Sequence, residues 1–177
     1  AIGLQNSITD SLIILKNRFI NIFNIFNENI ISFPSYQIDF LNFSGNYIDS
    51  GSNFNSISRS PLKASIFNNS FNGAYALTAL NMEFINNSVN GSFQCSYVDT
   101  LKIFNNVFRQ RNNTFLNYIN LSNTNLSGFK SDFNCYYFKP SKYCIVNQNF
   151  NQTHLSNKND FINFFQSDSN SVFTDPH

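Results

Sequence analysis

One six-residue pattern of apolar and polar positions recurs along the chain: an apolar residue, two positions, an asparagine, one position and another apolar residue. It occurs at 14–19, 43–48, 66–71, 84–89 and 103–108, and more weakly at 121–126. The five asparagines, separated by 29, 23, 18 and 19 residues, are Asn17, Asn46, Asn69, Asn87 and Asn106. A short strand, a tight bend and another short strand at such a period are typical of a solenoid, whose repeats stack on one another.

Within one repeat, the alternation of apolar and polar residues predicts three short strands. In the segment 73–108 we expect them near 74–77, 80–84 and 88–90, and again near 92–95, 101–103 and 107–108. Three strands per repeat predict a prism of three parallel sheets with about six coils. Inward residues then stack in columns, one of Phe43, Ile66, Phe84 and Ile103, and another of Ile2, Ile57, Tyr75, Phe93 and Phe115.

The recurring asparagines have a physical role in this scheme. A sharp bend between strands needs a residue at positive φ, and asparagine adopts that conformation at less steric cost than any residue except glycine. We therefore expect Asn17, Asn46, Asn69, Asn87 and Asn106 to form corners, with amides that hydrogen-bond from coil to coil. Their fixed placement favours a solenoid over a prion-like tract, although asparagine and phenylalanine are abundant, at 33 and 22 residues.

The chain is predicted to be a single domain, 1–177, with repeating coils over 1–129 and a last coil with its cover over 130–177. A last strand is expected at 132–138, then a helix from a cap at Ser156 to Gln166, and a short strand at 169–176. Such an amphipathic segment can cover the open end of a stack. Residues 1–4 resemble a strand within a domain and no signal peptide is visible, so we expect a fragment or a processed product.

The charge balance and the reactive residues limit the classes of partner and cofactor that we expect. Lys and Arg number 11 against 10 Asp and Glu, a balance that argues against nucleic acid and anionic membranes as partners. No apolar run is long enough to span a bilayer. Cys135 and Cys144 lie nine residues apart and are a candidate disulfide, with free thiols the open alternative. Two distant histidines and no CxxC pair predict no metal site and no evident cofactor.

Two features of the sequence, its repeat and its C-terminal segment, resemble a known group of proteins. The repeat of an Asn-Asn corner followed by an apolar residue, and the ending with 132–137, Leu155, 168–172 and Asp175-Pro176, resemble right-handed parallel β-helix proteins of the pectate-lyase-like superfamily. The resemblance implies an all-β right-handed β-helix, an extracellular or cell-surface location, and a polysaccharide or cell-surface glycan as partner. Calcium is implied by the resemblance alone. The superfamily contains lyases, hydrolases, tailspikes and adhesins, so the fold leaves the activity open.

The resemblance also directs the search for a site. In the lyases, the groove follows the first parallel sheet, expected here at 1–4, 55–58, 74–77, 92–95 and 114–117. Its outward residues are small or neutral, so if the intact protein is an enzyme, we expect its catalytic centre to lie outside this chain. Candidate sugar-binding residues are Arg59, Tyr97, Arg109, Arg111 and Tyr118. The alternatives are isolated surface cations and core or edge aromatics. Asp39, Asp49, Asp99 and Asp132 lie near turns, where a backbone role competes with a paired-carboxylate site.

Two functions remain in view: a carbohydrate-active or carbohydrate-binding β-helix protein, and a non-catalytic adhesin or structural solenoid. Whether the chain is an enzyme stays open. The N-x-S/T sequons number eight against roughly 6 expected by chance from the composition, so their number alone is weak support for glycosylation. They are Asn42, Asn68, Asn86, Asn90, Asn112, Asn120, Asn125 and Asn151.

Overall fold

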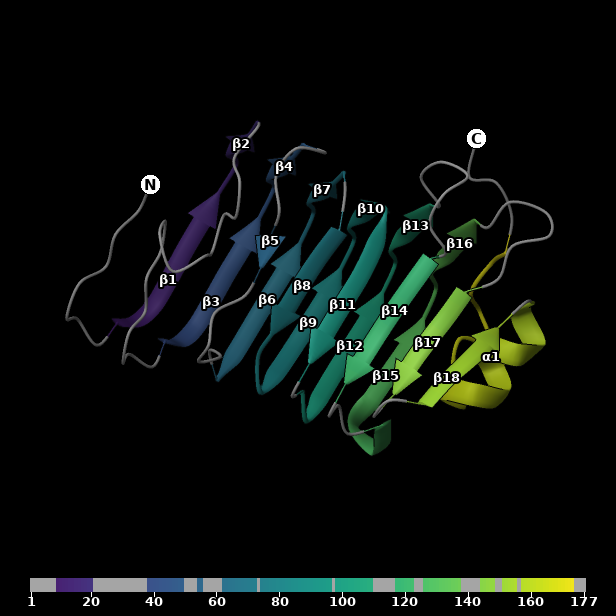
Figure 1. Cartoon of the computed structure of the whole chain (residues 1–177). Coiled ribbons are helices and arrows are strands. Elements are labelled where there is room, and N and C mark those ends of the chain that lie inside the picture. Colours follow the sequence, from purple (N-terminus) through teal and green to yellow (C-terminus); the bar gives the residue numbers. More distant parts are fainter. Residues whose placement is uncertain are drawn as a thin grey trace.

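In a computed structural model, the described residues are mostly β-strand, with one short α-helix (Figure 1). They are 9–20, 38–49, 54–55, 62–72, 74–96, 98–109, 117–122, 126–137, 144–148, 151–155 and 157–173. The strands are short because each carries only enough alternating apolar residues to cross one wall of the stack before the next bend.

The strands form three six-stranded sheets, which we name A, B and C. Sheet A consists of β1 (Thr9–Leu15), β3 (Ile38–Ser44), β6 (Lys63–Phe67), β9 (Asn81–Ile85), β12 (Thr100–Phe104) and β15 (Phe129–Asp132). Sheet B consists of β2 (Arg18–Phe19), β4 (Tyr47–Ile48), β7 (Ser70–Phe71), β10 (Ser88–Asn90), β13 (Val107–Arg109) and β16 (Cys135–Tyr137). Sheet C consists of β5 (Phe54–Asn55), β8 (Ala74–Thr78), β11 (Ser92–Ser96), β14 (Asn117–Ser122), β17 (Cys144–Gln148) and β18 (Asn151–Leu155).

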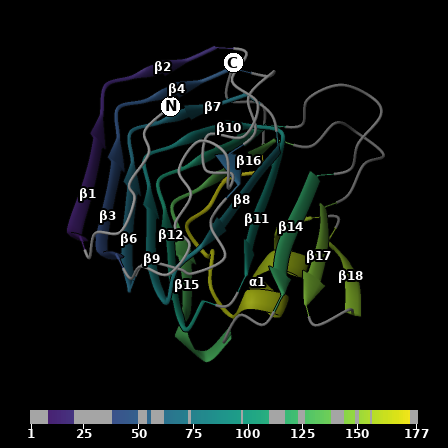
Figure 2. The ribbon, with the colours of Figure 1, turned by 60° about the vertical axis from the view of Figure 1, so that its left-hand side comes forward.

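The strands of each sheet stack in the order of the chain, coil upon coil (Figure 2). Neighbours pair in parallel, except that β17 and β18 form an antiparallel hairpin at the end of sheet C. The prediction of an all-β chain with stacked parallel strands is thus confirmed, and the fold is compatible with a β-helix-like solenoid. The hairpin was not anticipated. It gives sheet C a last strand of opposite direction, which a further parallel coil cannot extend in the same register.

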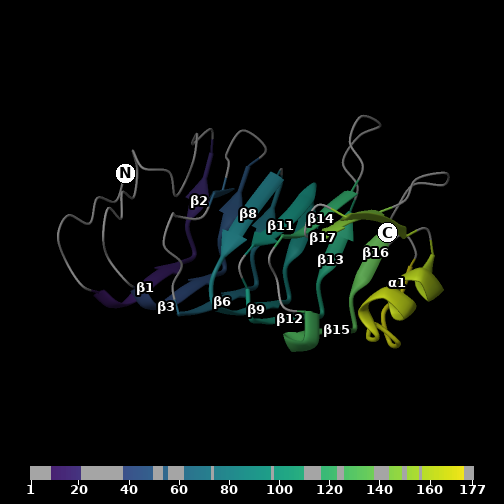
Figure 3. The same cartoon turned by 60° about the horizontal axis from the view of Figure 1, so that its bottom comes forward.

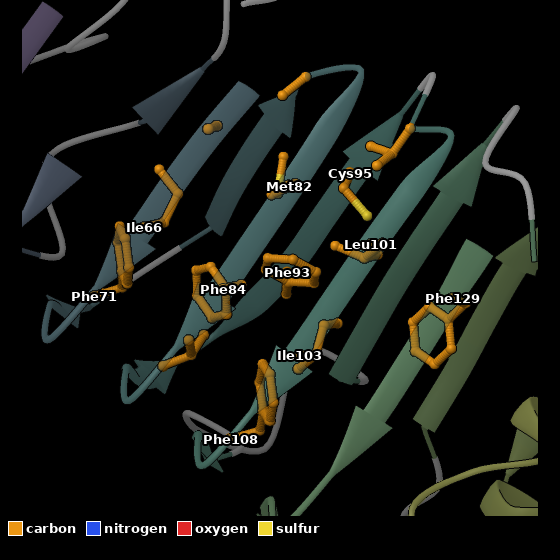
Figure 4. Close-up of a cluster of buried hydrophobic side chains, with 14 of the residues drawn as sticks. Ile66, Phe71, Met82, Phe84, Phe93, Cys95, Leu101, Ile103, Phe108 and Phe129 are labelled. Atoms are coloured by element: carbon orange, nitrogen blue, oxygen red, sulfur yellow. The ribbon is translucent and has the colours of Figure 1, made fainter. Parts of the chain in front are cut away.

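The core consists of stacked rows of buried side chains from sheets A and B, with Phe93 and Cys95 added by sheet C (Figure 4). The register of sheet A places Phe43 beside Ile66, Ile66 beside Phe84 and Phe84 beside Ile103, as predicted. All four are at most 2% exposed. Sheet B adds a second buried row, of Ile48, Phe71, Val89, Phe108 and Tyr136. Burial of each large side chain contributes about 1.5–3 kcal/mol, so the core needs no large helix.

The predicted register of sheet C is wrong at two positions. Tyr75 lies beside Phe93 as expected, but Phe54 rather than Ile57 stands opposite Tyr75, and Ile119 rather than Phe115 stands opposite Phe93. Ile2, Ile57 and Phe115 lie outside the described residues. The error arises where loops of unequal length precede the strand, because alternation fixes which face a residue takes but not which residue starts the pairing.

The end of the stack is covered by α1 (Lys158–Phe165), which lies beyond β15 and β16 (Figure 3). Its N-cap is Asn157, whose side chain accepts a hydrogen bond from the Asp160 N–H, and not the expected Ser156, which lies outside the described residues. Phe161 and Phe165 are buried, with Phe165 stacked on Phe129 at 4.5 Å between ring centroids. In place of the expected final strand, a parallel bridge joins Val172 to Cys135. The remaining short element is a 3-10 turn, η1 (Leu126–Gly128).

Candidate functional site

The recurring asparagines form a buried ladder between sheets A and B. The Oδ1 atoms of Asn46, Asn69, Asn87 and Asn106 each accept two hydrogen bonds from the asparagine one coil earlier, from its backbone N–H and its Nδ2. Asn17, in the first coil, is exposed and donates to this ladder. For Asn87 the donors are Asn69 N and Nδ2, both at 3.0 Å. Each Nδ2 of Asn46, Asn69, Asn87 and Asn106 also donates to a backbone carbonyl of the preceding coil. The amide capacity of these side chains is therefore satisfied inside the protein.

The positive φ falls one residue before each ladder asparagine, not on it. The left-handed residues are Lys16, Gly45, Asn68, Asn86, Asn105 and Phe133. They are exposed, whereas the ladder residues Asn46, Asn69, Asn87 and Asn106 are at most 3% exposed. The corner therefore divides two tasks between neighbouring residues: the first bends the backbone and faces solvent, and the second turns its amide inward to join adjacent coils.

The ladder continues to a sixth asparagine that the sequence pattern missed. Asn106 N donates to Asn134 Oδ1 at 2.9 Å, and Asn134 N in turn donates to Ser171 Oγ at 2.9 Å. The weak match at 121–126 does not supply this rung. Asn134 was hidden because the inward position three residues before it, apolar in the earlier repeats, is Ser131 here.

Ser131 belongs to a buried polar cluster around Asp168, which closes the last coil. Asp168 is fully buried, and its Oδ1 accepts hydrogen bonds from Ser131 Oγ at 2.8 Å and Ser171 Oγ at 2.7 Å. Tyr136 and Asn134 also donate to it, both at 3.3 Å. Oδ2 is buried with no partner among the described residues. Burial raises the pKa of Asp168 against the opposing effect of these four donors.

The outer face of sheet A carries charged side chains next to partly exposed apolar ones. We name it the lysine face: Lys63, Phe67, Glu83, Ile85, Lys102, Phe104 and Lys130. The register aligns Glu83 with Lys102 and Lys102 with Lys130 along one row. A neighbouring row aligns Phe67, Ile85 and Phe104, all partly exposed. Successive coils in a parallel sheet lie about 4.8 Å apart, so both rows run along the stack.

One ion pair crosses the lysine face. Lys102 Nζ donates to Glu83 Oε1 at 2.9 Å, and the two side chains are 41% and 31% exposed. The hydrogen bond from Lys102 holds the pKa of Glu83 below its usual value, with Lys63 acting in the same direction. No ion pair to Lys63 or Lys130 occurs among the described residues, so this face has a net positive charge.

The carboxyl groups described on this face are not arranged like a glycosidase pair. Glycosidases place two carboxyl groups about 5–10 Å apart and raise the pKa of one of them. On the described face, the pKa of Glu83 is lowered instead, and Asp132 lies two coils and two residues away, roughly 12 Å by strand spacing. Asp132 is engaged by Asn170, which donates from its N–H at 2.8 Å and its Nδ2 at 2.7 Å.

The two sugar-binding candidates that the structure describes, Arg109 and Tyr118, lie in different sheets. Arg109 ends β13 in sheet B, aligned with Asn90 and Tyr137, and Tyr118 lies in β14 of sheet C opposite Ile145. Arg59, Tyr97 and Arg111 lie outside the described residues. The lysine face was missed because the groove was sought on another sheet. A signal was present: in 63–67, 81–85 and 100–104, charged residues precede or separate the inward apolar residues.

The two candidate disulfide cysteines begin strands of different sheets. Cys135 opens β16 in sheet B, opposite Val107, and Cys144 opens β17 in sheet C, opposite Asn117. The Cys135–Cys144 disulfide stays a prediction. Within the described part of the chain, no group of three or more His, Cys, Asp or Glu residues is arranged to hold a metal ion.

Comparison with known proteins gives no family. No protein-family model matches this chain, and neither a curated protein nor a solved structure matches it. Among the described helices, none is both long and apolar enough to cross a membrane.

Proposed function

We propose that this protein is an extracellular or cell-surface β-helix that binds an acidic polysaccharide along the lysine face. The proposal includes the right-handed coil, the roughly six-coil count and the pectate-lyase-like kinship that the sequence resemblance implies. The observation that supports it is the alignment of Lys102 and Lys130 beside a row with partly exposed Phe67 and Phe104, with Lys63 at the start of β6 on the same side of the sheet.

This arrangement fits the chemistry of an acidic glycan. The apolar face of a sugar ring stacks on aromatic side chains, and ammonium groups attract the ring carboxylates. Both rows follow the stack, so an extended polymer can contact Lys102 and Lys130 on one row and Phe67, Ile85 and Phe104 on the other. Exposed cations contribute little individually, and avidity along the polymer therefore has to supply the affinity.

Affinity electrophoresis of the full chain in gels containing polygalacturonate or neutral dextran tests this proposal. We expect retardation by polygalacturonate that falls as salt rises. The double variant Lys63→Gln/Lys130→Gln should bind about fivefold more weakly, from about 0.5 kcal/mol per exposed contact. The matched control, Lys16→Asn/Arg18→Gln, removes the same charge at the corner and in sheet B, away from the face, and should bind like the wild type.

Equal retardation by dextran, or equal losses in the two double variants, would refute the lysine face as the binding surface. No retardation at all would favour the alternative function, a structural solenoid or an adhesin that uses another surface. Release of unsaturated or reducing ends from the polysaccharide would instead show an enzyme.

A further inference from the structure

The fold exposes some glycosylation sequons to solvent and partly buries others. Asn68 and Asn86 are exposed, left-handed corner residues, with φ of 56° each, on neighbouring coils. Ser70 and Ser88, two residues later, complete their sequons at the start of β7 and β10 and are partly or fully exposed. No hydrogen bond to either Asn68 or Asn86 side chain occurs in the described part of the molecule.

Two other sequons, at Asn42 and Asn90, are less exposed. Asn42 has a buried Oδ1, and the serine of its sequon, Ser44, is only 8% exposed. Asn90 is half-buried, and its Nδ2 donates to Asn72 Oδ1 at 2.9 Å. Asn42 lies within β3 between Ile13 and Ser65 with its amide oxygen buried, so a glycan there would have to expose that amide, whereas a glycan on a corner extends directly into solvent.

We infer that Asn68 and Asn86 are N-glycosylation sites and that the folded protein carries no glycan on Asn42. In the reaction, the asparagine amide nitrogen attacks the anomeric carbon of a lipid-linked oligosaccharyl diphosphate. The N-glycosidic bond forms, the bond from that carbon to the phosphate oxygen breaks, the lipid diphosphate leaves, and the amide loses one proton. This inference goes beyond glycan binding and does not depend on the lysine face.

The corner asparagine tolerates the modification because the ladder does not use it. At both sites the following residue, Asn69 or Asn87, makes the buried contacts between coils. The two corners are about one strand spacing apart, roughly 4.8 Å, so the first sugars on both would collide. We therefore expect one corner glycan per molecule, on either asparagine.

A single substitution can create a new glycosylation sequon at the equivalent corner of the next coil. Asn105 occupies the same corner one coil further, exposed and with φ of 55°, but is followed by Asn106 and Val107 and is no sequon. Val107→Ser creates one without changing the corner. Ser70→Ala and Ser88→Ala remove the existing sequons while leaving the corner backbone intact.

The experiment is secretion of the full chain from a eukaryotic host, followed by site-resolved mass spectrometry of its glycopeptides. We expect glycan on Asn68 and Asn86, with occupancies that sum to about one, and none on Asn42. Ser70→Ala should move occupancy to Asn86, and the double Ser→Ala variant should abolish it at both corners. Val107→Ser should add glycan at Asn105 in molecules that carry none on the adjacent Asn86. Unmodified Asn68 and Asn86 in the secreted wild type, or modified Asn42 in protein with the native circular dichroism spectrum, would overturn the inference.

Discussion

Replacing the central ladder residue, Asn87→Ala, tests the interaction that joins the coils. Asn87 is 2% exposed. Its Oδ1 accepts from Asn69 N and Nδ2, and its Nδ2 donates to Asn106 Oδ1 at 3.1 Å, Ile66 O at 2.9 Å and Ile85 O at 3.0 Å. Alanine removes all five bonds and leaves the Asn69 N–H buried without its acceptor.

The expected loss follows from these bonds. A buried hydrogen bond contributes about 1 kcal/mol net, and a buried donor left without a partner costs about 1–3 kcal/mol. Some lost bonds share one atom and some carbonyls keep other partners, so the five do not add fully. We therefore expect Asn87→Ala to lower the free energy of unfolding by about 3–5 kcal/mol, a large effect for one substitution.

Urea unfolding of the full chain, followed by circular dichroism, measures this change. The matched control is the adjacent corner residue, Asn86→Gly, which keeps the positive φ and removes no buried bond. It should alter the free energy of unfolding by less than about 0.5 kcal/mol. If Asn87→Ala costs no more than Asn86→Gly, the amide ladder does not hold the coils together, and the stack depends on its apolar column and its strand pairing instead.

Three further predictions concern the end cap, the corners and the core. Burial raises the pKa of Asp168 above its ordinary value of 3.8, so the folded protein holds a proton that the unfolded chain releases. The stability that this proton contributes is complete below the ordinary pKa and is lost as pH rises through the raised pKa of the folded state. Asp168→Asn should therefore flatten the decline in melting temperature between pH 4 and 8. An unchanged slope of melting temperature against pH would contradict this assignment. Phe133 is 58% exposed and has a φ of 55°, so Phe133→Gly should raise the free energy of unfolding, measured with urea, by about 0.5–1 kcal/mol. A lower free energy of unfolding would show that contacts of the ring outweigh the backbone strain. Phe84 is 1% exposed and packs on Phe71 and Phe93 at 5.8 and 4.8 Å between centroids, so Phe84→Ala should cost about 3–5 kcal/mol by the same assay, and a cost below 1 kcal/mol would contradict the packed column.

The candidate site was less predictable than the fold. Lys63, Glu83 and Lys102 each look like ordinary surface residues in sequence, because a single exposed charge has no distinctive pattern. They become a face only when the strands stack in register, and the register depends on loop lengths such as that between Asn17 and Asn46. The sugar-binding candidates Arg109 and Tyr118 were chosen by residue type, and the structure puts them on different sheets.

The sequence by itself determined the period of the coil and the inward column from Phe43 to Ile103. Both follow from local alternation and from spacing that repeats along the chain, and neighbouring residues are enough to define them. Only the tertiary structure decided which asparagine of each pair turns inward, since both fit a bend, and the choice depends on an amide partner in the next coil. The tertiary structure also determined that Asp168 is buried. Its burial arises because Ser131 and Asp168, 37 positions apart in the sequence, meet where the stack ends.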